Sequence, residues 1–443
     1  MQKLGLSNLR RQNPVGQGFF HSAFLLEEGD LRLSYVYDCG AMAKYSDARE
    51  REIDKFEAVA KTYSVKKLDI LCLSHVHADH VNGIERLLQS LKVDTIMLPL
   101  LNVADRLIAY GRTAVEDPAS AQSGFYRDFI VDPAAALGRF EPRQILFVEP
   151  GGEGGAPGGG DGPIEPSAGP GGGLRDKVSS GEHGSSWFLV GRGEPRFAQN
   201  QSDSSAVAAV IPDTMAMMIT AMATATGAKI GGSRGAWLLA PYIDTMVESQ
   251  RKRFLRALAK QCKMTIKLLE NWLLSTANIQ DLVVNKVDRL AAAYAMIASN
   301  LNVTSMSLYS GPARSIASGE PRSWTSLVGG VSCQWSSVRI AWLATGDAAL
   351  KQSQRRNDLL SHYAQLLEQV ITLTLPHHGS DHNFHVDLLK GVQPSLCVAA
   401  ADSYSTWKHP GAHTVQAVCS HPALLQVVTS KKASRVWELA SLG

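Results

Sequence analysis

The opening part of the chain alternates apolar and polar positions and then turns to continuous apolar runs. Residues 17–40 alternate in two bursts, which predicts a β-hairpin. Residues 68–74 and 94–100 are nearly all apolar, as expected for strands that are buried on both faces. Residues 49–63 and 83–91 have the apolar spacing of amphipathic helices. This alternation of strand and helix predicts a layered α/β domain.

The same alternation returns near the end of the chain. Strands are predicted at 304–310, 338–346, 370–376 and 395–401. Helices are predicted at 348–368 and 412–428. One domain that is split by an insertion explains this pattern better than two independent domains do.

The segment between the two α/β parts has a different composition. Residues 150–173 are mostly Gly and Pro, which cannot bury a core and indicate a flexible linker. Most of 242–300 has helical spacing and is expected to form two or three helices. We therefore predict one domain in two halves, at 1–149 and 301–443. Between the halves we predict a flexible linker at 150–175 and a mainly helical insertion at 176–300.

Composition narrows the class of protein. The chain has 443 residues, more than a single layered domain usually needs. Its net charge of +3 is too small to argue for a nucleic-acid or membrane partner. No apolar run reaches about 18 residues, so no membrane span is predicted, and the start of the chain does not have the pattern of a signal peptide. The six cysteines form no C-x-x-C pair, so no zinc-ribbon or redox motif is predicted. We expect a cytoplasmic protein.

The strongest chemical signal is the run SHVHADHVNG at 74–83. His75, His77, Asp79 and His80 follow the pattern H-x-H-x-D-H at the end of an apolar strand. Imidazoles and a carboxylate suit zinc, manganese or iron. The alternating pair His75 and His77 can point to one side while the following turn aims the other two at a neighbouring point. A chance cluster of surface histidines is the alternative, and the preceding buried strand disfavours it.

Two later strands also end in polar turns. Asp347 follows the strand in LATGDAAL, where it is a candidate carboxylate bridging two cations. His377 and His378 follow the strand in LTLPHHGS. Either histidine could bind metal, and we expect one ligand and one structural or outer partner. His382 and His385 are expected to be ordinary loop residues.

These motifs together resemble the metallo-β-lactamase superfamily. The match is most similar to the hydrolase domain of the ComEC competence family and its free-standing relatives. It covers about 15–148 and 300–428. It rests on Asp38, SHVHADH at 74–80, Asn302 to Ser305, Gly346-Asp347, Pro376 to Ser380, and His409-Pro410.

The resemblance implies a fold and a ligand set. The fold would be an αββα sandwich of two mixed sheets with helices outside. One or two divalent ions, zinc or manganese, would be bound, with Asp347 bridging them. His75 and His77 would hold the first metal, and the second would be held by Asp79, His80 and His378. The outer partners would be Asp38, His377 and Ser380.

One departure from the superfamily concerns the first metal. Many members supply it with a third histidine from a loop between the first motif and the Gly-Asp strand. In this chain His183 is the only histidine between His80 and Asp347. Either His183 or water is expected to complete that position.

The implied activity is a metal-dependent hydrolase, and three hypotheses stay open. The first is a phosphodiesterase or nuclease, in which Asp79 helps to hold the proton of an activated water and His409 contacts the substrate or leaving group. The basic segment 250–267 could contact phosphates, although a solvated helix face is the commoner case. The second is a lactonase-like carboxyl or thioester hydrolase. The third is a defence or DNA-processing component that binds a protein partner through 176–300.

Overall fold

The structure is a computed structural model, which describes most of the chain. The described residues are 6–151, 154–158, 187–197, 206–220, 236–297, 304–313, 322–328, 330–336, 339–405 and 407–442. His183 and Asn302 lie outside them, as does most of the predicted linker at 150–175. Predictions that concern those residues therefore stay predictions.

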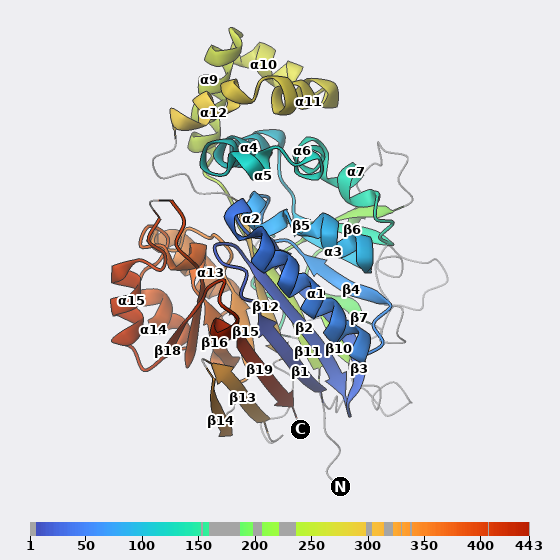
Figure 1. Cartoon of the computed structure of the whole chain (residues 1–443), viewed down its shortest axis with the longest axis vertical. Coiled ribbons are helices and arrows are strands. Elements are labelled where there is room, and N and C mark those ends of the chain that lie inside the picture. Colours follow the sequence, from blue (N-terminus) through green and yellow to red (C-terminus); the bar gives the residue numbers. More distant parts are fainter. Residues whose placement is uncertain are drawn as a thin grey trace.

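Two β-sheets make up the centre of the molecule (Figure 1). The first sheet has the order β14 (Val331–Ser336), β13 (Arg322–Val328), β19 (Val436–Leu442), β1 (Leu6–Gln12), β2 (Phe20–Glu27), β3 (Asp30–Cys39), β4 (Lys67–Cys72), β5 (Lys92–Pro99), β6 (Gln144–Glu149), β9 (Val207–Pro212), β8 (Arg196–Phe197). The second has the order β18 (Leu424–Val428), β17 (Leu396–Ala400), β16 (Val370–Thr374), β15 (Ala341–Ala344), β12 (Ser305–Pro312), β11 (Ala236–Asp244), β10 (Met215–Thr220), β7 (Trp187–Gly191).

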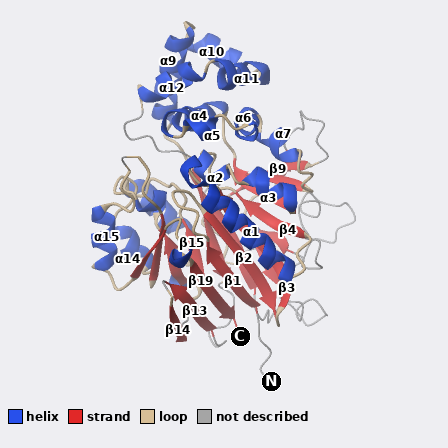
Figure 2. Ribbon diagram, viewed as in Figure 1, coloured by secondary structure: helices blue, strands red, loops and turns tan. Residues whose placement is uncertain are grey.

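Helices flank both sheets (Figure 2). Those on the side of the first sheet are α1 (Ser46–Thr62), α2 (Ala78–Val81), α3 (Ile84–Ser90), α4 (Val103–Glu116), α5 (Pro118–Ala121), α6 (Gly124–Val131), α7 (Pro133–Gly138), α9 (Glu248–Cys262), α10 (Ile266–Trp272), α11 (Thr276–Asn285) and α12 (Val287–Ala295). Those on the side of the second are α13 (Ser353–His362), α14 (Asp387–Val392) and α15 (Ala412–Cys419). Short 3₁₀ turns lie at Ala43–Tyr45, Leu367–Gln369, Pro376–Gly379 and Lys432–Ser434.

Three apolar cores separate these layers. One lies between the two sheets and includes Trp187, Trp237 and Trp342. A second joins the outer face of the first sheet to its helices, and a third does the same for the second sheet. Helix, sheet, sheet and helix therefore follow one another, and the predicted αββα sandwich is confirmed.

Parallel strands run through part of each sheet. β3, β4, β5, β6 and β9 are parallel neighbours in the first sheet, and β15 to β18 are parallel neighbours in the second. The loops after β4, β15, β16 and β17 leave the carboxyl ends of these strands. In open α/β sheets such ends are where ligand sites are built.

The structure differs from the sequence prediction at the end of the chain. A helix was predicted over 412–428, but only Ala412–Cys419 is helical. Leu424–Val428 forms β18, which pairs in parallel with β17. The run LLQVV is a short apolar segment next to a strand partner, so pairing with the sheet overrides its helical spacing.

The region 176–300 also contains more sheet than we expected. Among its described residues, β7, β10 and β11 join the second sheet, and β8 and β9 join the first. The predicted helices begin at Glu248, where α9 to α12 form a cap over α4 (Figure 1). Within the described residues, no helix combines the length and the apolar character needed to cross a bilayer.

Candidate metal centre

The histidine cluster lies in the loop that follows β4. This loop leaves the carboxyl end of a strand that is buried between β3 and β5. His75 and His77 lie in its extended part, and the short helix α2 then turns the chain so that Asp79 and His80 face the same centre. All four side chains are buried.

Two loops from the second sheet reach the same point. Asp347 follows β15, and its backbone N–H donates to Ser305 Oγ over 2.9 Å. His377 and His378 follow β16 and have φ values of +48° and +57°. Left-handed backbone is uncommon for residues other than glycine, so this turn stores strain that aims both rings inward. The His377 N–H donates to Gly346 O over 2.9 Å, which ties the two loops together.

Asp347 lies at the middle of the cluster. Its Oδ2 is 3.4 Å from His75 Nε2, 4.0 Å from His77 Nδ1 and 3.6 Å from His377 Nε2. Its Oδ1 is 3.6 Å from His80 Nε2. The two carboxylate oxygens therefore face two neighbouring spaces. We call the space bounded by His75, His77 and Asp347 the first position.

The second position is bounded by Asp79, His80, Asp347 and His378. His378 Nε2 is 3.2 Å from Asp79 Oδ2, and His80 Nε2 is 3.8 Å from the same oxygen. The ligand atoms of His80, Asp347 and His378 all lie within 4.8 Å of one another. Residues from both sheets thus converge on one buried point.

Outer hydrogen bonds fix the orientation of the rings at the second position. His80 Nδ1 donates to Asp38 Oδ2 over 2.8 Å, and Asp38 also accepts from the Ser74 N–H over 2.7 Å. His378 Nδ1 donates to Ala400 O over 2.7 Å. Since each Nδ1 donates, each Nε2 would present its lone pair to the centre once the ring is neutral. Such outer partners orient metal-binding imidazoles.

The unpartnered atoms of the cluster test whether it fits a cation. In a neutral His378 ring whose Nδ1 donates to Ala400 O, the Nε2 lone pair would face the Asp79 carboxylate with no donor between the two acceptors. Buried polar atoms without partners are costly unless something binds them. Among the described residues, four such atoms of the cluster have no hydrogen-bond partner: His75 Nε2, His77 Nε2, His80 Nε2 and Asp347 Oδ1. Nitrogen and carboxylate donors of this kind fit zinc or manganese.

Electrostatics keeps most of these groups in the ionisation states that metal binding requires. Burial raises the pKa of Asp347, but the imidazoles beside it hold that pKa well below its usual range. Burial lowers the pKa of His75 and of His77. Burial also lowers the pKa of His80, but nearby carboxylates, Asp79 first, raise it to about 9. A cation would compete with that proton, so metal affinity should depend on pH.

The remaining predicted site residues lie at the edge of the cluster. The His409 ring centroid is 5.7 Å from that of His377 and 6.3 Å from that of His378. Ser380 is buried and shapes the turn, since its N–H donates to His377 O and its hydroxyl accepts from the His382 N–H. His382 is exposed and His385 pairs with Asp387, so neither faces the centre.

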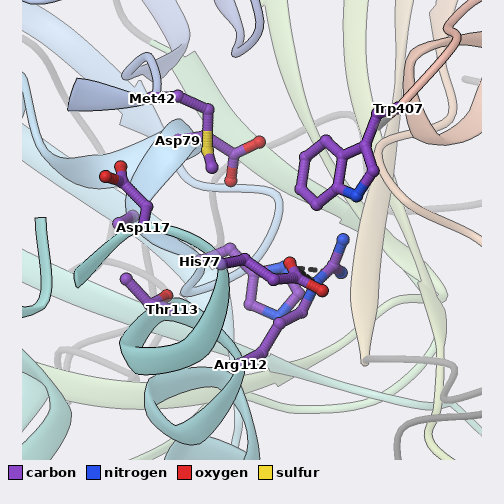
Figure 3. Close-up of a pocket in the computed structure, with 9 residues that line it drawn as sticks. Met42, His77, Asp79, Arg112, Thr113, Asp117 and Trp407 are labelled. Atoms are coloured by element: carbon purple, nitrogen blue, oxygen red, sulfur yellow. Dashed lines mark hydrogen bonds and ion pairs between the residues drawn. The ribbon is translucent and has the colours of Figure 1, made fainter. Parts of the chain in front are cut away.

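Sequence reasoning missed Arg112, which reaches the cluster from α4. Its guanidinium donates to His77 Nδ1 over 3.2 Å and to His377 Nε2 over 3.1 Å. Glu116 holds it from the same helix, and Trp407 lies under it (Figure 3). Nothing in the local sequence marks this arginine, because only the packing of α4 places it there. A pocket beside the centre is lined by His77, Arg112, Glu116 and Trp407, together with Met42, Ala78, Asp79, Thr113 and Asp117.

Comparison with known families agrees with this geometry. Residues 16–174 match the family model of the metallo-beta-lactamase superfamily, a stretch that contains His75, His77, Asp79 and His80. No curated protein matches the chain. The two sheets with flanking helices are consistent with the fold of that superfamily.

Proposed function

We propose that this chain is a metal-dependent hydrolase that cleaves phosphodiester bonds with a water molecule. The observation that carries the proposal is the meeting of ligands from both sheets at one buried point. His75, His77, Asp79 and His80 come from the first sheet, and Asp347 and His378 come from the second. Open nitrogen and carboxylate ligands, without a closed cysteine cage, are typical of catalytic rather than structural sites.

The chain's own residues suit a hydrolytic step. A divalent cation held there would supply a water of lowered pKa and stabilise charge at the attacked centre. Asp79 is well placed to hold the proton of the attacking water, because one of its oxygens faces His378 and His80 at the second position. His409 lies beside the imidazoles of His377 and His378, where it would contact the substrate.

A row of basic side chains on α9 favours a polyanionic substrate. Lys252, Arg253, Arg256 and Lys260 are exposed, and their spacing places them on one face of the helix. Arg251 on the same helix pairs with Asp105 of α4 over 2.7 Å. The basic row is thus fixed to the helix that also carries a side chain of the metal centre. Phosphate backbones bind such rows, and the free energy of that binding falls with salt.

A panel of substrates tests the proposal. The purified protein is loaded with Mn²⁺ or Zn²⁺ and assayed against bis(p-nitrophenyl) phosphate, single-stranded DNA, a cyclic nucleotide and a lactone. We expect metal-dependent release of p-nitrophenol or cleavage of DNA. A chelated sample and the Asp347→Asn variant serve as controls, and both should lose that activity.

The same panel separates the competing functions. Turnover of the lactone alone would replace the phosphodiesterase by a carboxyl-ester hydrolase. Failure to turn over any substrate, in protein that elemental analysis shows to be loaded, would favour the role as a partner-binding component. We also propose that the chain is a ComEC-like member of the superfamily and that its metal is zinc or manganese.

A further inference from the structure

Arg112 occupies an unusual place for a cation. Its side chain is only 14% exposed and lies against imidazoles that border the candidate metal centre. A buried guanidinium needs acceptors for its N–H groups. Two of those acceptors are His77 Nδ1 and His377 Nε2, and both of these nitrogens also face Asp347 Oδ2.

Hydrogen bonds show which nitrogen of His377 is the acceptor. The Asn383 amide nitrogen donates to the carbonyls of Asp347 and Ala348, over 3.3 and 3.4 Å. Its Oδ1 must therefore face His377 Nδ1, 3.0 Å away, and Nδ1 must carry the proton. The lone pair of His377 is then on Nε2, where it accepts from Arg112.

Each neutral imidazole has a single lone pair. The His77 nitrogen that lies within 4.0 Å of Asp347 is Nδ1, the same atom that accepts from Arg112. A cation at the first position would need that lone pair, and it cannot be shared with an N–H donor. Binding of a metal at the first position and the Arg112 hydrogen bonds therefore exclude each other.

The second position has no such conflict. His80 Nε2 faces Asp79 and Asp347, His378 Nε2 faces Asp79, and Arg112 donates to neither nitrogen. Four ligands are available there, which is a common number for zinc. Of the two imidazoles at the first position, Arg112 contacts His77 but not His75. No third histidine is found among the described residues between His80 and Asp347.

Other contacts hold Arg112 in place. Its Nε donates to Glu116 Oε2 over 2.6 Å, and the Tyr294 hydroxyl bonds to the other Glu116 oxygen over 3.2 Å. The guanidinium carbon lies 5.7 Å from the ring centroid of Trp407. Figure 3 shows the guanidinium between His77 and Trp407. Moving it out would break an ion pair and two charge-assisted hydrogen bonds, each of which contributes stability when buried.

We propose that Arg112 stands in the place of the first metal, so that the centre binds one divalent cation per chain, at the second position. The guanidinium then supplies a fixed positive charge beside Asp347, where a two-metal enzyme would have its other ion. This inference rests on the metal-binding part of the proposed function. It predicts a stoichiometry rather than an activity.

Metal stoichiometry tests the inference directly. Wild-type protein is saturated with Zn²⁺, freed of excess metal and analysed for metal content, and a Co²⁺ titration is followed by its visible absorption. We expect about one ion per chain and a single break in the titration. In Arg112→Met, which has similar length but no N–H donor, we expect about two ions and a second break. Arg139→Met is the matched control, since Arg139 is 46% exposed and pairs with Asp128, and it should stay at one ion.

The outcomes are distinct. Two ions in the wild-type protein would overturn the inference and leave the proposed hydrolase intact. One ion in a folded Arg112→Met would also overturn it, because the guanidinium would then not be what excludes the second ion. If Arg112→Met does not fold, Arg112→Leu, which also has no N–H donor, replaces it, and the wild-type count still decides the main claim. A wild-type protein that binds no ion at all would refute the metal centre and, with it, the proposed function.

Discussion

Asp38 accepts a 2.8 Å hydrogen bond from His80 Nδ1, which links the end of β3 to the ligand loop after β4. Asp38 has a φ of +56°, an uncommon conformation for an aspartate, and its second oxygen accepts from the Ser74 N–H. The ring of His80 is therefore oriented by backbone geometry that does not depend on a bound cation.

The first prediction concerns this hydrogen bond. Asp38→Asn removes the negative charge but keeps the size of the side chain. We expect metal affinity to fall by about 10–100-fold, because that is the usual effect of losing an outer partner of a metal-binding histidine. Competition with a chromophoric chelator measures the affinity. Asp69→Asn, a buried carboxylate that bonds to Ser34, is the control and should leave the affinity unchanged.

The second prediction concerns the ligands themselves. Asp79→Ala or His80→Ala should abolish turnover, because each removes a group that borders the second position. The loss should exceed the roughly 100-fold that an outer partner contributes. Initial rates at saturating metal measure the loss. His382→Ala is the matched variant in the neighbouring loop and should behave like wild type. Wild-type rates in both ligand variants would refute the site assignment.

The third prediction concerns the basic row of α9. Replacing Arg256 and Lys260 by Ala should raise KM for single-stranded DNA several-fold. It should also reduce the slope of the logarithm of the binding constant against the logarithm of the salt concentration by about two. The reason is that two phosphates are no longer neutralised by the protein. The rate on bis(p-nitrophenyl) phosphate should not change, because that substrate has a single phosphate and no further backbone for the row to bind. An unaltered salt slope would mean that the row is only a solvated helix face.

The fourth prediction concerns stability against pH. Burial lowers the pKa of His362 to about 4, and its Nε2 donates to Pro241 O over 3.0 Å. Since this folded pKa lies below the unfolded value near 6.5, folding favours the neutral ring, and stability is lost as pH falls from about 6.5 to about 4. The loss is about 3 kcal/mol.

Urea denaturation at pH 7 and pH 4.5 measures this loss. The His362→Gln variant keeps a donor for Pro241 but does not titrate, so it should lose less stability than wild type between the two values. His413→Gln, at an exposed histidine, is the control. Equal pH dependence in wild type and His362→Gln would contradict the prediction.

The fifth prediction concerns an ion pair inside the sandwich. Arg10 on β1 makes two hydrogen bonds to Glu438 on β19, of 2.9 and 3.0 Å, and both side chains are buried. Glu438→Gln leaves the guanidinium charge uncompensated and should lower the free energy of unfolding by about 3–5 kcal/mol. Arg10→Met combined with Glu438→Leu should cost less than the single change, because no buried charge remains. Chemical denaturation of the three proteins checks the order.

The sequence predicted the strands that carry the ligands because each is a short, continuous apolar run that ends in a polar turn. The runs at 68–74 and 370–376 correspond to Lys67–Cys72 and Val370–Thr374 in the structure. A strand that is buried on both faces must be apolar throughout, so such a strand can be predicted from the sequence alone.

Other features left no such local signal. Val207–Pro212 and Met215–Thr220 are strands, yet their small apolar residues are compatible with several structures, and only pairing with neighbouring strands decides. His377 was expected to be an outer residue, but it lies as close to Asp347 as several predicted ligands do. The place of Arg112 depends on how α4 packs over the sheet, which no spacing of residues encodes.

The candidate ligands that border the second position come from distant parts of the chain. His80 lies in the first fifth of the sequence and His378 in the last fifth, so the two meet only when both halves of the sandwich have been synthesised and packed. A ribosome-bound or truncated chain would have no complete cage. The cation would then bind only to chains that have already folded, and its binding free energy would stabilise the folded state alone.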